Sequence, residues 1–140
     1  MGNSDQISKL IMRLADKLNN KGDRMYIAVD FDGTVVQHEY PAIGGLVPLA
    51  IPTIKKWMEA GHKIILNTMR SGKELDDAVS FLMKQGITLY GVNRNPTQDR
   101  WTKSPKVYAH IYVDDAAYGC PLIHPEDGGR PYVDWSKIKI

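Results

Sequence analysis

The sequence of 140 residues has a single cysteine, no long hydrophobic run and little net charge, and each of these absences excludes a class of protein. Cys120 has no partner for an internal disulfide and no companions for a cysteine-based zinc site. The uninterrupted apolar stretches are a few residues long, well short of a membrane-spanning helix. A net charge of +2, spread along the chain, does not indicate nucleic-acid binding.

A secretion signal is also missing from the start of the sequence. Polar residues follow Met1, where a signal peptide would have a basic region and then an apolar core. We therefore expect a cytoplasmic protein with no membrane partner. A chain of 140 residues can bury one hydrophobic core but is too short for two ordinary domains, so we predict a single domain over residues 1–140.

The stretch 26–34, Tyr-Ile-Ala-Val-Asp-Phe-Asp-Gly-Thr, carries the most specific chemical signal. Its apolar first half predicts a buried strand, and Asp30 and Asp32 follow where that strand ends. Ligands of open α/β sheets bind at the carboxyl ends of strands. Two carboxylates so close together repel each other unless a hard cation such as Mg2+ lies between them. On spacing alone the same residues also fit an ordinary turn.

Apolar periodicity predicts helices and strands in alternation, which is typical of a parallel sheet with right-handed crossovers. We predict an α/β fold, a three-layer α/β sandwich, with an N-terminal helical extension over 1–22 and an irregular C-terminal tail over 118–140. In this tail the apolar side chains of 132–135 and Ile138 could dock on the body. The face of the first helix either packs on the sheet or serves self-association. The expected helices are 4–18, 46–60, 73–85 and a short turn near 105–108; the expected strands are 26–29, 62–67, 87–92 and 110–113, with 93–104 as a loop.

Further polar residues follow the later strands in a recognisable order. Thr68 comes after strand 62–67, Lys106 precedes the last strand, and Asp114 and Asp115 end it. Together with the 26–34 stretch, this order resembles the haloacid dehalogenase (HAD) superfamily of phosphohydrolases over about residues 26–115. The resemblance implies a mainly parallel, Rossmann-like sheet. No interval between the motifs is long enough for a cap domain, so we expect the compact, capless type.

The HAD resemblance also implies catalytic roles. Asp30 would attack phosphorus and form a covalent aspartyl-phosphate, and Asp32 would act as the general acid and base. Lys106 would neutralise negative charge in the transition state, with Lys103 as the alternative.

The remaining site residues follow from the same resemblance. The turn with Thr68, Met69 and Arg70 is assigned to substrate binding together with Thr34, whose hydroxyl also fixes the first turn. Arg70 is either a phosphate ligand or a structural residue. The Mg2+ cofactor would be held by Asp30, by Asp32 through its backbone carbonyl, and by Asp114, while Asp115 binds through water or orients the lysine.

The sequence therefore predicts a Mg2+-dependent phosphatase acting on a phosphomonoester, either a small molecule or a polymer end. A phosphotransferase with the same site, or a non-catalytic binding module with this fold, are the alternatives. His38, Arg94 and Arg100 lie on loops that either rim the pocket or belong to the ordinary surface. The natural substrate and a homo-oligomeric state are left open.

Overall fold

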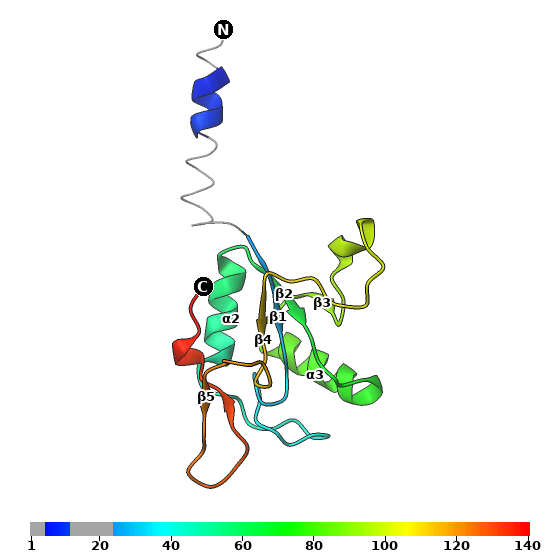
Figure 1. The fold of residues 1–140 in the computed structure, drawn as a ribbon, viewed down its shortest axis with the longest axis vertical. Coiled ribbons are helices and arrows are strands. Elements are labelled where there is room, and N and C mark those ends of the chain that lie inside the picture. Colours follow the sequence, from blue (N-terminus) through cyan, green and yellow to red (C-terminus); the bar gives the residue numbers. More distant parts are fainter. Residues whose placement is uncertain (1–4, 12–23) are drawn as a thin grey trace.

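The computed structural model describes residues 5–11 and 24–140. Residues 5–11 are helical, and the body contains short strands alternating with helices (Figure 1). Within the described ranges, no helix has the length and apolar character needed to cross a membrane. The elements of the body are β1 (Tyr26–Val29), α2 (Ala50–Glu59), β2 (Lys63–Leu66), α3 (Gly72–Lys84), β3 (Leu89–Val92), η1 (Pro96–Arg100), β4 (Ile111–Val113), β5 (Leu122–Ile123), β6 (Tyr132–Val133) and η2 (Trp135–Lys137).

The central sheet has the strand order β3-β2-β1-β4, and every pairing in it is parallel. This confirms the predicted α/β fold with a parallel sheet. Val29 of β1 is in register with Leu66 of β2 and Val113 of β4, so these three strands end at the same level. Residues that follow the three strands are therefore brought to one edge of the sheet.

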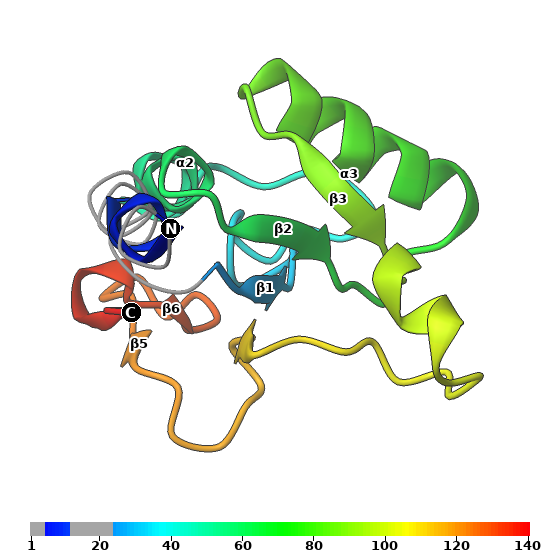
Figure 2. The same cartoon turned by 90° about the horizontal axis from the view of Figure 1, so that it is seen from above.

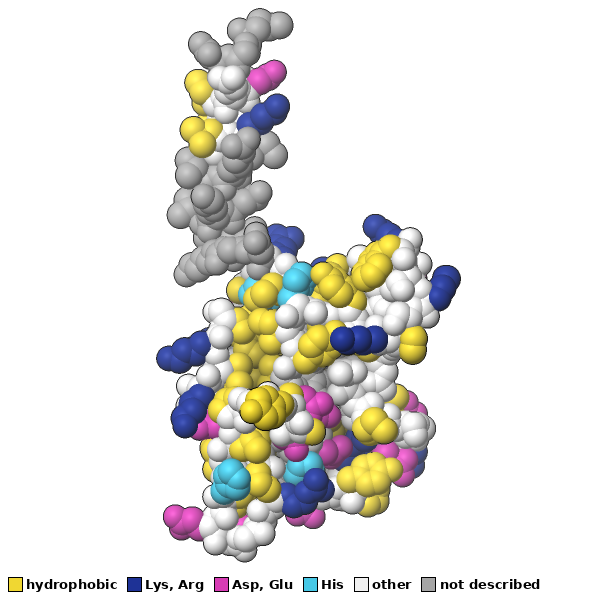
Figure 3. All heavy atoms as spheres, viewed as in Figure 1, with side chains coloured by type: hydrophobic (Ala, Val, Ile, Leu, Met, Phe, Trp, Pro, Cys, Tyr) yellow, Lys and Arg dark blue, Asp and Glu magenta, His cyan; other side chains and the backbone are white. Residues whose placement is uncertain are grey.

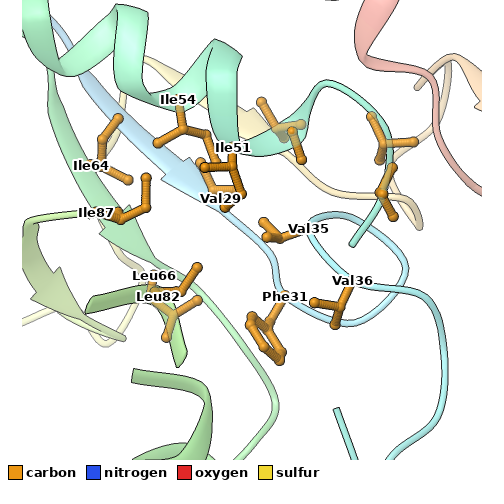
Figure 4. Packing of buried hydrophobic residues seen from close by; sticks show 14 of the residues in the cluster. Val29, Phe31, Val35, Val36, Ile51, Ile54, Ile64, Leu66, Leu82 and Ile87 are labelled. Carbon is orange, nitrogen blue, oxygen red and sulfur yellow. The ribbon is translucent and has the colours of Figure 1, made fainter. Parts of the chain in front are cut away.

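Helices α2 and α3 lie on the same face of the sheet (Figure 2). The reason is that β1, β2 and β3 are consecutive neighbours, and right-handed crossovers in one direction place their helices on one side. The main hydrophobic core fills the space between these helices and the sheet (Figure 4). Its side chains include Val29, Ile51, Ile54, Ile64, Leu66, Leu82 and Ile87, each buried. Burial of one such side chain contributes about 1.5–3 kcal/mol to folding.

The opposite face of the sheet is covered by the segment 93–110, which contains η1 but no α-helix. Asn95 is fully buried; its side chain accepts a hydrogen bond from the Thr97 amide (2.9 Å) and donates to the Tyr108 carbonyl (2.9 Å). This capping places the helical turn at 96–100, inside the predicted loop. The turn predicted near 105–108 is wrong, because residues 105 and 106 form a bend. The third layer of the predicted sandwich is thus largely irregular chain.

The C-terminal segment is more ordered than its many glycines and prolines suggest. β5 and β6 form an antiparallel pair, and Val133 and Trp135 are buried. The Val133 amide donates to the Gly33 carbonyl (3.0 Å), and Trp135 Nε1 donates to the Thr34 carbonyl (2.8 Å). The prediction of an irregular tail over 118–140 is therefore corrected: long-range contacts to the turn after β1 order this segment.

The predicted N-terminal helix is described for residues 5–11, where Ile7, Leu10 and Ile11 are more than half exposed. The described part of its apolar face therefore does not pack on the sheet. Residues 12–18 of the predicted helix lie outside the described residues.

Candidate functional site

Three carboxylates from two strand ends meet at the carboxyl edge of the sheet. Asp30 follows β1, and Asp114 and Asp115 follow β4; one oxygen of each lies within 4.8 Å of the others. The strand pairing continues to this point, since the Asp30 amide donates to the Val113 carbonyl (2.9 Å). In Figure 3 acidic side chains gather in the lower half of the face shown, where the segment after β1 lies in Figure 1. We call Asp30, Asp114 and Asp115 the acid cluster.

The pKa values of two carboxyl groups in the acid cluster are raised. Burial raises the pKa of Asp30 from 3.8 to about 8, and the negative charge of Asp114 and a hydrogen bond with Asp115 act in the same direction. The pKa of Asp114 is raised as well, again mainly by burial. Without a bound cation, the cluster therefore holds a proton near neutral pH. Perturbed acids in one cluster are typical of functional sites.

Thr34 connects Asp30, which follows β1, to Asp115, which follows β4. Its hydroxyl donates to Asp30 Oδ2 (3.1 Å) and accepts a hydrogen bond from the Asp115 amide (3.2 Å). The side chain is completely buried. This buried hydroxyl orients the Asp30 carboxylate, and the assignment of Thr34 to substrate binding stays a prediction. The prediction that it fixes the first turn is confirmed.

His38 reaches the acid cluster from the loop 37–45, which follows the turn after β1. Its Nε2 lies 2.9 Å from Asp115 Oδ2. The loop is closed at its base by the hydrogen bond from the Gln37 amide to the Gly45 carbonyl (2.8 Å). Gly33 has a φ of 82°, and a Cβ there would collide with both the His38 ring and the Asp115 carboxylate. The close approach of this loop therefore requires glycine at position 33.

Asp32 and Arg70 form a bidentate ion pair. Arg70 Nε donates to Asp32 Oδ2 and Arg70 Nη2 donates to Asp32 Oδ1, each at 2.8 Å. The Asp32 side chain therefore faces the guanidinium and is not a member of the acid cluster. Arg70 is 2% exposed, which favours the structural one of its two predicted roles; substrate binding by Arg70 stays a prediction. This bonding, above all the hydrogen bonds to Asp32, raises the pKa of the Arg70 guanidinium.

Comparison with known proteins places the chain in a family. No protein-family model and no curated protein matches the chain. A solved structure does match, described as that of the conserved protein coded by locus from Bacteroides thetaiotaomicron, with 35% sequence identity and a TM-score of 0.67. The match covers 81% of this chain and 85% of that chain. The chain belongs to the family of this Bacteroides protein.

The residues of the acid cluster fit a hard divalent cation. Mg2+ and Ca2+ prefer carboxylate oxygens, and the acid cluster supplies three that are already close together. Within the described ranges, the basic side chain in contact with the cluster is His38, while Arg70 is engaged by Asp32. A bound cation would offset both the cost of burying the Asp30 charge and its repulsion by Asp114, which together raise the pKa of Asp30. Asp30, Asp114 and Asp115 are therefore the residues that could hold a metal.

The turn after β2 brings Thr68 to the same edge of the sheet. Its amide donates to Asn93 Oδ1 (2.7 Å), and its hydroxyl oxygen accepts a hydrogen bond from the Arg70 amide (3.1 Å). In the described part of the chain the Thr68 hydroxyl donates to no acceptor, so its proton is available for a ligand. The neighbouring Met69 side chain is 97% exposed and could contact a ligand from outside.

Lys106 is not brought into the acid cluster. It is exposed, and its ammonium lies 5.8 Å from the centre of the Tyr112 ring. Among the described residues no ion pair joins Lys106 or Lys103 to Asp30, Asp114 or Asp115. Tyr112 belongs to β4, so Lys106 lies near the strand that leads to Asp114 and Asp115. Its catalytic role stays a prediction.

Two contributors to the site carry no local sequence signal of their role. The sequence allows two locations for His38, the rim of the pocket or the ordinary surface. In the structure His38 contacts Asp115. Trp135 lies about a hundred residues from Thr34 in the chain, yet its indole donates to the Thr34 carbonyl. Such pairings depend on the folded chain path, which neither spacing nor periodicity reveals.

Proposed function

We propose that the protein is a Mg2+-dependent phosphatase that hydrolyses a phosphomonoester through a covalent intermediate on Asp30. The observation that carries the proposal is the acid cluster at the carboxyl edge of a parallel sheet, with Asp30 oriented by Thr34. The order of the motifs in the sequence, which resembles the HAD superfamily, supports the same assignment. Support also comes from Thr68, whose hydroxyl can donate to a phosphoryl oxygen.

The proposed reaction has two steps. Asp30 attacks phosphorus and the bond from phosphorus to the leaving oxygen breaks. Asp32, which must enter this step protonated while it accepts the hydrogen bonds from Arg70, gives that oxygen a proton. In the second step Asp32 removes a proton from water, and the water oxygen attacks the phosphorus of the aspartyl-phosphate. The bond from phosphorus to the Asp30 oxygen breaks, which releases inorganic phosphate and regenerates the carboxylate. Each step is a displacement at phosphorus that leaves Asp32 ready for the other.

Mg2+ bound to Asp30, Asp114 and Asp115 would supply positive charge that offsets repulsion between the carboxylates and the phosphoryl group. The residues of the chain have separate tasks around that charge. Thr34 holds the Asp30 carboxylate in one orientation, and His38 does the same for Asp115. Thr68 would donate to a non-bridging oxygen of the substrate. Lys106 would approach from the face of the sheet that carries Tyr112.

Turnover of an aryl phosphate such as p-nitrophenyl phosphate tests the proposal. We expect hydrolysis in the presence of Mg2+, loss of activity on chelation and recovery when Mg2+ is added back. Asp114→Asn should raise the Mg2+ concentration needed for half-maximal rate, while Asp76→Asn, an exposed aspartate on α3, should not. Hydrolysis that is insensitive to chelation, or no hydrolysis of any phosphomonoester in a broad screen, would refute the proposed function.

A further inference from the structure

Arg70 connects three separate parts of the chain around the site. Its guanidinium bonds to Asp32, to the tip of the loop 37–45 and to the first turn of α3. The side chain is 1% exposed, although arginine is almost never fully buried unless it is paired. A buried arginine with this many partners organises the groups that it contacts.

Every N–H donor of the Arg70 guanidinium is engaged. Nε donates to Asp32 Oδ2 (2.8 Å), and Nη2 donates to Asp32 Oδ1 (2.8 Å) and the Ala42 carbonyl (2.8 Å). Nη1 donates to the carbonyls of Pro41 (3.2 Å) and Glu74 (3.3 Å). A guanidinium has five N–H donors and no acceptor, so none is left for a phosphate.

Two aromatic rings fix the plane of the guanidinium. The Arg70 Cζ atom lies 5.0 Å from the centre of the Phe31 ring and 5.1 Å from that of Tyr40. Phe31 lies between Asp30 and Asp32, and Tyr40 belongs to the loop 37–45. The same loop carries His38, which contacts Asp115. The loop is thus attached to the site at two points, one through Arg70 and one through His38.

We infer that Arg70 is a positioning residue that holds Asp32 and the loop 37–45 in their working places. This inference rests on the proposed function, in which Asp32 transfers the protons. A bidentate pair fixes both carboxylate oxygens, and a lysine could not reproduce it, because an ammonium lacks the planar fork. Arg70 therefore acts through Asp32 and does not touch the substrate.

Steady-state kinetics of Arg70 variants with p-nitrophenyl phosphate separates positioning from phosphate binding. For Arg70→Ala we expect kcat to fall about 100-fold, the order of loss that misplacement of a reacting group by 1 Å causes. KM and the inhibition constant of inorganic phosphate should stay unchanged. Added guanidinium, below the concentrations that unfold the protein, should restore part of kcat. Arg94→Ala is the matched control, because Arg94 is an exposed arginine paired with Asp99.

Hydrogen exchange of the loop 37–45 gives a second readout that needs no activity. Its amides should exchange faster in Arg70→Ala than in the wild type or in Arg94→Ala. If Arg70→Ala does not fold, Arg70→Lys is used in its place. For Arg70→Lys we expect a reduced kcat, faster exchange of the loop amides and no recovery of kcat with added guanidinium.

The two readouts distinguish failure of this inference from failure of the proposed function. A weaker inhibition by phosphate with unchanged kcat would make Arg70 a phosphate ligand and overturn the inference. Wild-type kinetics and loop exchange in Arg70→Ala would overturn it as well. If the wild type hydrolyses no phosphomonoester, the proposed function fails, and loop exchange alone decides whether Arg70 holds the loop.

Discussion

The His38 Nε2 atom lies 2.9 Å from Asp115 Oδ2, although 77 positions separate the two residues in the chain. This contact joins the loop 37–45 to the acid cluster and limits the rotation of the Asp115 carboxylate. Residues that orient a metal ligand commonly affect metal affinity about 10–100-fold. His38 is therefore expected to control how tightly the cluster holds Mg2+.

We predict that His38→Ala raises the Mg2+ concentration required for half-maximal turnover about tenfold, at the lower end of the range for such residues. Calorimetric titration with Mg2+ should give the same change in affinity. His124→Ala, which removes an exposed histidine outside the cluster, is the control. Equal Mg2+ dependence in both variants would show that the contact with Asp115 has no role in metal binding.

The raised pKa of Asp30 makes the stability of the metal-free protein depend on pH. In the unfolded chain this carboxyl has a pKa of 3.8, and in the folded protein about 8. Between these values the folded protein binds a proton that the unfolded chain has released. Its contribution to stability is therefore complete below pH 3.8 and is lost as the pH rises through about 8.

We predict that the free energy of unfolding of the wild type with EDTA falls relative to that of Asp30→Asn as the pH rises from 3.8 to about 8, and that the difference becomes constant above this window. Mg2+ competes with the proton, so the increase in Tm caused by Mg2+ should become larger over the same window. Thermal unfolding at several pH values measures both effects. A wild-type curve parallel to that of Asp30→Asn would contradict the raised pKa.

Trp135 supports the site from the C-terminal segment. Its indole donates to the Thr34 carbonyl, and its ring centre lies 5.6 Å from that of Trp57. We predict that Trp135→Phe lowers the free energy of unfolding by about 1–3 kcal/mol, because it leaves a buried carbonyl without a partner. Trp135→Ala should cost about 3–5 kcal/mol. Urea unfolding measures both.

The control for Trp135 is Trp101→Phe at an exposed position, where a change within about 0.5 kcal/mol is expected. Because Thr34 orients Asp30, Trp135→Phe should also reduce turnover. A Trp135→Phe variant as stable and as active as the wild type would show that the C-terminal segment does not support the turn.

The sequence predicts the sheet and the meeting of the acids well, because both follow from local patterns. An apolar strand that ends in Asp30 and another that ends in Asp114 and Asp115 must converge if the two strands pair in parallel, as β1 and β4 do. The boundaries of β1 follow directly from its apolar residues.

The partners of those acids could not be predicted in the same way. Arg70 follows Thr68 in a turn, and its sequence position fits a phosphate ligand as well as a structural residue. The choice depends on Asp32 and on the carbonyls of Pro41 and Ala42, which the fold brings to it from distant positions. Local capping by Asn95 likewise decided where the helical turn of the 93–110 segment lies.

Turnover of p-nitrophenyl phosphate by Asp30→Asn in saturating Mg2+ tests the central assignment most directly. The substitution keeps the size of the side chain but replaces the nucleophilic carboxylate by a neutral, weakly nucleophilic amide, so we predict no detectable hydrolysis from a protein with a wild-type circular dichroism spectrum. Asp76→Asn should hydrolyse the substrate at the wild-type rate. An unchanged rate in Asp30→Asn would contradict the covalent mechanism and the role of the acid cluster in it.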